Sequence, residues 1–140
     1  MKRLLVATHG NFAEGIKSSL TLLVGQLHNI DFISAYVSEE DVTQALQKFL
    51  AQVDKTDEAV IFTDLPGGSV NQKAMLAVNQ QNVFIVSGFN LPVILEVYLA
   101  TRALTEASLQ QMIENSRNNL LLVNHQMGAV SEDSESDFFN

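Results

Sequence analysis

Residues 4–13 read Leu-Leu-Val-Ala-Thr-His-Gly-Asn-Phe-Ala, and this stretch decides the fold. The apolar run Leu4–Ala7 predicts a short buried strand, and apolar residues at helical spacing from Ala13 onward predict a helix directly after it. His9 and Gly10 lie on the turn between the two. Ligands and reactive groups gather at the carboxyl ends of strands in open α/β sheets. The His9 imidazole is therefore the first candidate for a functional side chain.

The same alternation of apolar runs and helical patterns continues along the chain. Later strands are predicted at Ile30–Val37, Ala59–Thr63 and Val83–Ser87, and helices follow each of them, the fourth running to about Leu104 and a fifth opening at 105 or 106. Strands alternating with helices imply right-handed crossovers and a mainly parallel sheet covered on both faces. We therefore expect one doubly wound α/β domain over residues 1–130 with strand order 2-1-3-4. An acidic tail without fixed structure is expected over residues 131–140.

Polar residues mark the predicted helix starts. The pairs that resemble capping boxes or caps are Asn11 with Glu14, Ser38 with Asp41, and Ser69 with Gln72. Gly25 is predicted to end the first helix.

Composition excludes several classes of function. The chain has 140 residues, of which 46% are hydrophobic and 17% charged, as expected of a globular protein with a real core. A net charge of −8 argues against nucleic-acid binding, which needs a Lys/Arg surface. No apolar stretch approaches the roughly 18 residues of a membrane span, and the absence of cysteine fits a cytoplasmic protein. Three scattered histidines without cysteine predict no metal site.

A second loop, Asp64–Ser69, reads Asp-Leu-Pro-Gly-Gly-Ser and follows the third predicted strand. In the expected strand order it lies beside the His9 loop. An Asp64 carboxylate that accepts one imidazole N–H would fix the tautomer of His9 and leave the other nitrogen free to attack. The imidazole itself is then the covalent carrier, because Ser69 is better suited to capping a helix or donating a hydrogen bond.

A phosphoryl group is a sensible cargo for this histidine. Gly10, Gly67 and Gly68 allow close approach of backbone N–H groups, and each loop leads into a helix N-terminus, which favours anions. Neither loop contains Lys or Arg, so the group would be held by amides and hydroxyls and could leave easily. No Walker-type lysine or carboxylate cluster for magnesium is present, which argues against direct use of ATP or of another cofactor.

Simpler interpretations stand beside these. His9 could be a solvated or capping residue, and Asp64–Gly68 could be only a tight turn, since Asp, Pro and Gly are the usual turn formers. His28 is expected on the surface, and His125 has no nearby partner at metal-ligand spacing. Four apolar residues near the loops form a candidate docking patch for a partner protein, although some could be ordinary packing: Phe12, Leu65, Pro66 and Phe89.

Three motifs taken together, Thr8–Gly10, Asp64–Ser69 and Gly88–Pro92, resemble the IIA component of the mannose family of the bacterial phosphoenolpyruvate-dependent sugar phosphotransferase system. The resemblance covers about residues 1–125 in order and spacing. It implies a phosphohistidine relay in which His9 accepts a phosphoryl group from the phosphocarrier protein HPr. His9 would pass the group to the cognate IIB component, which phosphorylates the sugar imported by the membrane components IIC and IID.

The resemblance also assigns roles to residues. His9 would be phosphorylated and Asp64 would orient it, while Thr8, Ser69 and the loop amides around Gly67 and Gly68 would contact the phosphoryl group. The family forms homodimers that exchange a late antiparallel strand, and Leu120–Val123 is the segment that could do so here.

Two departures from the family pattern are visible. Val70 stands where many members have proline after the serine, and Asn71–Lys73 replaces small apolar residues. Two other functions remain open from the sequence: the phosphotransfer subunit of a dihydroxyacetone kinase, and a regulatory binding module of the same fold without catalysis.

Overall fold

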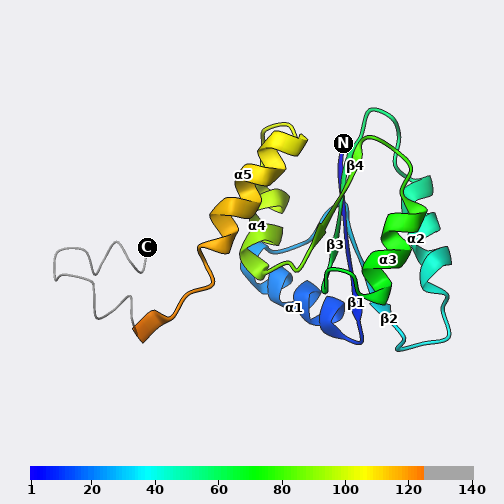
Figure 1. Ribbon diagram of the computed structural model, residues 1–140, viewed down its shortest axis with the longest axis horizontal. Coiled ribbons are helices and arrows are strands. Elements are labelled where there is room, and N and C mark those ends of the chain that lie inside the picture. The colour runs from blue at the N-terminus through cyan, green and yellow to red at the C-terminus, as the bar shows by residue number, and fades with distance from the viewer. Residues whose placement is uncertain (125–140) are drawn as a thin grey trace.

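The computed structural model describes residues 1–124, which form a four-stranded sheet with helices on both faces (Figure 1). The elements follow in the order β1 (Lys2–His9), α1 (Phe12–Val24), β2 (Ile30–Ala35), α2 (Val42–Ala51), β3 (Glu58–Thr63), α3 (Ser69–Ala77), β4 (Val83–Ser87), α4 (Leu91–Leu99) and α5 (Glu106–Arg117).

The strand order is β2-β1-β3-β4 and all three pairings are parallel, which confirms the predicted doubly wound α/β sheet. The chain reverses its direction of winding between β1 and β3. The register places Ala7 opposite Thr63 and His9 opposite Ala35. The carboxyl ends of β1, β2 and β3 therefore lie at one edge, where a crevice is expected.

The sheet is buried on both faces because its central strands carry unbroken apolar runs. In β1, Leu4 and Val6 belong to the core under α1, α4 and α5, whereas Leu5 and Ala7 belong to the core under α2 and α3. Figure 1 shows the two groups of helices on opposite sides of the strands. This alternation follows from the period of two in a strand, and it fixes the register strongly.

Helix starts agree with the sequence at the later elements. The Asp41 carboxylate accepts the Gln44 N–H at the start of α2, and the Asn90 side chain accepts the Val93 N–H at the start of α4. Helix α5 opens with a capping box in which Thr105 and Ser108 exchange hydrogen bonds.

The predicted capping boxes at the two site loops are wrong. Asn11 occupies the N-cap of α1 without any side-chain bond, because the Thr8 hydroxyl accepts the Ala13 N–H at 2.8 Å instead. At α3 the N-cap is Gly68, which has no side chain, and Ser69 is the first helical residue. The start of α3 is therefore left without a side-chain cap.

One further expectation at the C-terminal side is corrected. Helix α4 ends at Leu99 rather than near Leu104: its last carbonyls accept hydrogen bonds from the Lys2 ammonium, and Ala100 is extended. Among residues 1–124, Leu120–Val123 pairs with no strand of the sheet, and its exchange between the subunits of a dimer stays a prediction. The expected acidic tail over 131–140 lies outside the described residues.

A charged cluster at the opposite edge of the sheet from His9 predicts a pH dependence of stability. The Asp57 carboxylate accepts the Asp54 N–H at 2.9 Å and lies 3.1 Å from both the N-terminal ammonium and Arg3 Nε. These contacts, the backbone N–H first, lower the pKa of Asp57 to about 2. The stabilisation is therefore present above the ordinary pKa of 3.8 and is lost as the pH falls toward about 2.

We expect an Asp57→Asn protein to unfold at lower urea concentration than the parent chain at neutral pH, with the difference shrinking below about pH 3. Urea unfolding at neutral and acidic pH measures both effects. The exposed Asp31 offers a matched control, because Asp31→Asn should leave the difference near zero at either pH. An unchanged pH dependence in the Asp57 variant would show that this cluster does not contribute.

Candidate functional site

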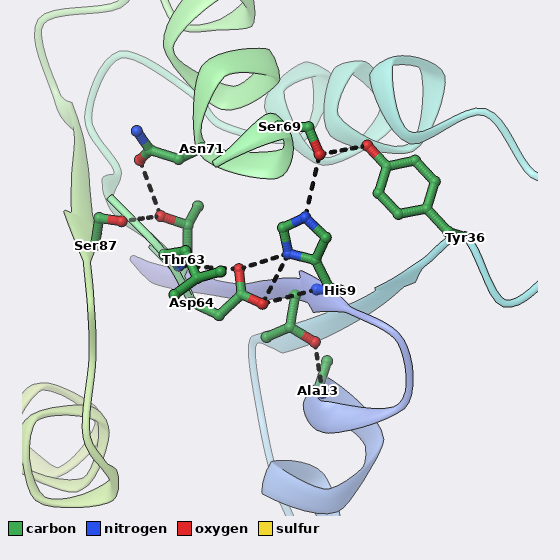
Figure 2. A network of polar contacts seen from close by, with 10 residues as sticks. His9, Ala13, Tyr36, Thr63, Asp64, Ser69, Asn71 and Ser87 are labelled. Atoms are coloured by element: carbon green, nitrogen blue, oxygen red, sulfur yellow. Dashed lines mark hydrogen bonds and ion pairs between the residues drawn. The ribbon is translucent and has the colours of Figure 1, made fainter. Parts of the chain in front are cut away.

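The structure brings His9 and Asp64 into direct contact at the carboxyl edge of the sheet (Figure 2). His9 is the last residue of β1, and Asp64 directly follows the neighbouring strand β3. Asp64 Oδ2 accepts the His9 backbone N–H at 2.9 Å and lies 3.0 Å from His9 Nδ1, while Oδ1 lies 3.2 Å from the same ring nitrogen. One carboxylate thus holds both the backbone and the ring of His9.

Asp64 is suited to this contact as an anion. Burial raises the pKa of the Asp64 carboxyl, but the hydrogen bonds from the His9 backbone and ring outweigh burial and leave the pKa below its ordinary value. The carboxylate is ionised at neutral pH and can only accept hydrogen bonds. We therefore assign the Nδ1 position of His9 as the protonated one, which leaves the lone pair on Nε2.

His9 Nε2 points at the start of α3. Ser69 Oγ lies 3.1 Å from Nε2, and Ser69 is the first residue of that helix (Figure 2). No side-chain cap occupies the first backbone N–H groups of α3, which carry the positive end of the helix dipole, so an anion beside Ser69 would be favoured. An imidazole held in this way can act as a nucleophile through Nε2.

The glycines of the second loop make this approach possible. A Cβ on Gly68 would lie 3.2 Å from both Leu65 Cβ and Leu65 O, which is tight, and 3.4 Å from His9 Cε1, so glycine suits the close packing of this loop. Gly67 has a φ of +75°, which favours glycine at the turn into α3.

The first loop positions His9 but offers no free group at Thr8 or at the Gly10 amide for binding a ligand. The Gly10 N–H donates to Ala35 O at 2.9 Å and its φ is +58°, so Gly10 forms the turn out of β1 and its amide is already occupied. Thr8 is fully buried and caps α1 through Ala13. The predicted contacts of Thr8 and of the Gly10 amide with a phosphoryl group do not fit these positions.

A polar cluster fixes the strand end that carries Asp64. The Thr63 hydroxyl donates to Asn71 Oδ1 at 2.9 Å, and Ser87 Oγ lies 2.7 Å from Thr63 Oγ1 (Figure 2). These side chains come from β3, α3 and β4 and are at least partly buried. They tie the three elements together directly behind the His9–Asp64 pair.

Two site residues escaped the sequence analysis, Tyr36 and Lys73. The Tyr36 hydroxyl lies 2.9 Å from Ser69 Oγ, and Lys73 Nζ lies 3.1 Å from the Tyr36 hydroxyl. Two signals could have found them: Tyr36 directly follows β2, the strand on the other side of β1, and Lys73 lies four residues after Ser69 on the same face of α3. The two site loops contain no Lys or Arg, but the site has a cation one turn farther along the helix.

The candidate docking residues lie next to the site loops in the chain: Phe12 opens α1, Leu65 and Pro66 follow Asp64, and Phe89 follows β4. Phe12 is half exposed and stacks on Phe89 with ring centroids 5.4 Å apart, and Leu65 and Pro66 are exposed on the second loop. Phe89 also meets the buried Phe62 edge to face at 6.4 Å. The Phe12–Phe89 pair therefore presents an apolar surface that is anchored in the core.

Among residues 1–124, no helix has the length and apolar character needed to cross a membrane. Within the same range, no three His, Cys, Asp or Glu side chains are grouped as metal ligands would be.

Fold and site together define a doubly wound α/β protein with a histidine, oriented by an aspartate, at the point where the sheet reverses its winding. The family model described as the PTS system fructose IIA component, of the mannose-type EIIA group, matches residues 3–117. The chain belongs to this family, and it is a IIA component of the sugar phosphotransferase system.

Similar proteins agree with this assignment. The mannose-specific EIIAB component of the phosphotransferase system of Escherichia coli K12 is 27% identical over 101 residues, which are 69% of this chain. The matched part spans about a third of that relative, 31% of its length.

Solved structures share the whole fold. A Klebsiella pneumoniae protein described provisionally as a permease of the phosphoenolpyruvate-dependent sugar phosphotransferase system has a TM-score of 0.81 and 29% identity, over 90% of this chain and 93% of its own. The phosphotransferase system component EIIA of Streptococcus agalactiae has a TM-score of 0.74 and 28% identity, over 89% of this chain and 99% of its own.

Proposed function

We propose that this chain carries a phosphoryl group on His9 Nε2, which it accepts from phosphorylated HPr and passes to a cognate IIB component during sugar uptake. The observation that carries the proposal is the contact of Asp64 with Nδ1, because it leaves the Nε2 lone pair directed at the uncapped start of α3. Membership in the IIA family supplies the classes of donor and acceptor.

The transfer step needs only the groups present at this edge. The Nε2 lone pair attacks the phosphorus of the donor's phosphohistidine, and the donor's N–P bond breaks as the new one forms. The Nδ1 proton stays on His9, so the phosphorylated ring carries positive charge, which the Asp64 carboxylate stabilises. In passing the group on, the nucleophile of IIB attacks the phosphorus and the N–P bond to His9 breaks, which returns the lone pair to Nε2.

Ser69 and the second loop would receive the phosphoryl oxygens. The new group occupies the space where Ser69 Oγ now contacts Nε2, and the Ser69 hydroxyl then donates to a phosphoryl oxygen rather than to the ring. The backbone N–H groups at the start of α3 add partial positive charge. Gly67 and Gly68 keep this loop close enough to the ring for those contacts.

HPr and IIB would dock in turn on the same apolar rim. Each partner must bring its phosphorus or its nucleophile into line with Nε2, so both must cover the opening of the site. The Phe12–Phe89 pair, Leu65 and Pro66 form a surface of that kind. The membrane components IIC and IID would be reached only through IIB, and the working place of the chain would be the cytoplasm.

A homodimer is part of this proposal. Leu120–Val123 carries apolar side chains that are all exposed, with Leu120 and Leu122 at 88% and 70%. Within residues 1–124 neither outer strand of the sheet pairs with this segment. Addition of the segment to the sheet of a second copy would bury both surfaces.

The test is a phosphorylation assay with phosphoenolpyruvate, Enzyme I and HPr, read by intact mass and by mapping of the modified residue. We expect one phosphoryl group per chain on His9, and its loss when a IIB component is added. Mapping to another residue, or uptake without HPr, would contradict the proposal.

A further inference from the structure

A tyrosine and a lysine that no step above uses lie directly beside the nucleophile. The Tyr36 ring lies 5.7 Å from the His9 ring, and its hydroxyl contacts Ser69 Oγ at 2.9 Å (Figure 2). Lys73 Nζ contacts the same hydroxyl at 3.1 Å and lies 5.0 Å from the centre of the Tyr36 ring. Lys73 thus holds Tyr36 by a hydrogen bond and by its charge over the ring.

These contacts form one chain of hydrogen bonds with a single consistent direction. Lys73 can only donate, and the Asp64 carboxylate can only accept. Between them Lys73 donates to Tyr36, Tyr36 to Ser69, Ser69 to His9 Nε2, and His9 Nδ1 to Asp64. A cation therefore lies on the Nε2 side of the imidazole and an anion on the Nδ1 side.

The backbone at Tyr36 is held in a strained conformation. Its φ is +68°, in the left-handed region that a bulky side chain rarely adopts. Such a conformation persists only where the surroundings determine it, and it often accompanies a functional site. Here it accompanies the contact of the Tyr36 hydroxyl with Ser69, while about half of the tyrosine stays exposed.

We propose that Tyr36 and Lys73 form the cationic side of the phosphoryl site, where the Tyr36 hydroxyl and the Lys73 ammonium donate to oxygens of a phosphoryl group on His9 Nε2. This inference rests on the proposed function and adds two binding residues to it. When the group forms, its oxygens replace the ring nitrogen as acceptors at the Ser69 end of the chain of hydrogen bonds. The Tyr36 hydroxyl and Lys73 then face a dianion.

The present state of Tyr36 agrees with this assignment. When Tyr36 is ionised, the Ser69 hydroxyl and the Lys73 ammonium can donate to the phenolate, and these two contacts, Ser69 first, lower the pKa of the Tyr36 phenol below its ordinary value. A phosphoryl dianion in the same place would oppose the phenolate by like-charge repulsion and raise that pKa again. Phosphorylation of His9 and ionisation of Tyr36 are thus coupled, and each must disfavour the other by the same factor.

Single variants with matched controls test the contact by rate. Tyr36→Phe and Lys73→Met should each lower kcat/KM for phosphoryl uptake from HPr by about tenfold, since each removes one hydrogen bond to a charged group. Lys73→Arg should recover most of the rate. The controls are Tyr98→Phe and Lys17→Met, since Tyr98 contacts the His28 N–H and Lys17 lies over Phe32 away from the site. Both controls should match the parent chain.

Ionisation of Tyr36 gives a readout that a purely structural role would not move. The chain has two tyrosines and no tryptophan, so Tyr98→Phe leaves Tyr36 as the only phenol seen by ultraviolet absorption. Alkaline titration of this variant before and after phosphorylation measures the ionisation midpoint of Tyr36 in two proteins that differ only in the phosphoryl group. We expect the midpoint to rise by about one pH unit on phosphorylation.

The outcomes separate the two proposals. A chain that takes up no phosphoryl group overturns the proposed function and this inference with it. A chain that is phosphorylated on His9 overturns this inference alone if the Tyr36 midpoint stays in place. The same holds if the Tyr36 and Lys73 variants transfer as fast as their controls.

Discussion

A His9→Gln protein should take up no phosphoryl group from HPr, where the parent chain takes up one. Glutamine can still donate to Asp64 through its side-chain amide, so the loop keeps a hydrogen-bonding partner. The lone pair of an amide nitrogen is delocalised into its carbonyl, so no nucleophile remains at the position of Nε2. Incorporation should fall below detection in the mass assay, and transfer to IIB should cease with it.

The control for this variant is His28→Gln. His28 lies in the turn between α1 and β2, at the amino ends of the strands, whereas the site lies at their carboxyl ends. Its replacement should leave uptake unchanged. The His9 side chain is 39% exposed, so its replacement should cost little stability, and urea unfolding checks this. Retained uptake in the His9 variant would place the nucleophile on another residue.

The fold could be predicted because its determinants are periodic. The strands at Leu4–Ala7, Ala59–Thr63 and Val83–Ser87 are continuous apolar runs, as parallel strands buried on both faces must be. With right-handed crossovers, the alternation left few possible strand orders, and 2-1-3-4 was confirmed. The contact of His9 with Asp64 followed from that order, because both end adjacent strands.

The predicted helix caps at the two site loops are wrong because several side chains compete for the same backbone groups. Asn11 has the right residue type and spacing for a cap, but the Thr8 hydroxyl reaches the Ala13 N–H first from the buried end of β1. The Ser69 hydroxyl contacts the imidazole and Tyr36 instead of capping its own helix. The sequence pattern cannot predict which of these hydrogen bonds forms, because that depends on distances set by the tertiary structure.

Tyr36 and Lys73 escaped prediction for a related reason. The two loops contain no cation, whereas Lys73 lies in the second turn of α3 and contacts the site through Tyr36, which directly follows β2. Asn71–Lys73 had been noted only as a departure from the family pattern. In the structure, Asn71 contacts Thr63 behind the site and Lys73 contacts Tyr36 in front of it.

An Asp64→Asn protein should keep His9 but transfer its phosphoryl group about 10²- to 10⁴-fold more slowly. Both carboxylate oxygens of Asp64 accept backbone N–H groups, Oδ2 from His9 and Oδ1 from Leu65. The amide NH₂ of asparagine must replace one of these oxygens and then faces a donor. If the NH₂ group takes the position of Oδ2, it also reverses the tautomer of His9. An NH₂ group beside Nδ1 makes Nδ1 the acceptor and moves the ring proton to Nε2.

The loss of the negative charge of Asp64 also slows phosphoryl transfer, as the reversed tautomer does. Phosphorylated His9 with a proton on Nδ1 is cationic, and a neutral asparagine cannot stabilise it as the carboxylate does. Rapid-mixing kinetics with HPr should therefore show a lower rate of uptake at saturating donor, since the docking residues are untouched. Asp31→Asn is the matched control, as it removes an exposed carboxylate from β2 without touching His9. If the Asp64 variant transferred within about threefold of this control, orientation and charge at Nδ1 would not limit the reaction, and the start of α3 together with Ser69, Tyr36 and Lys73 would have to account for the reactivity of Nε2.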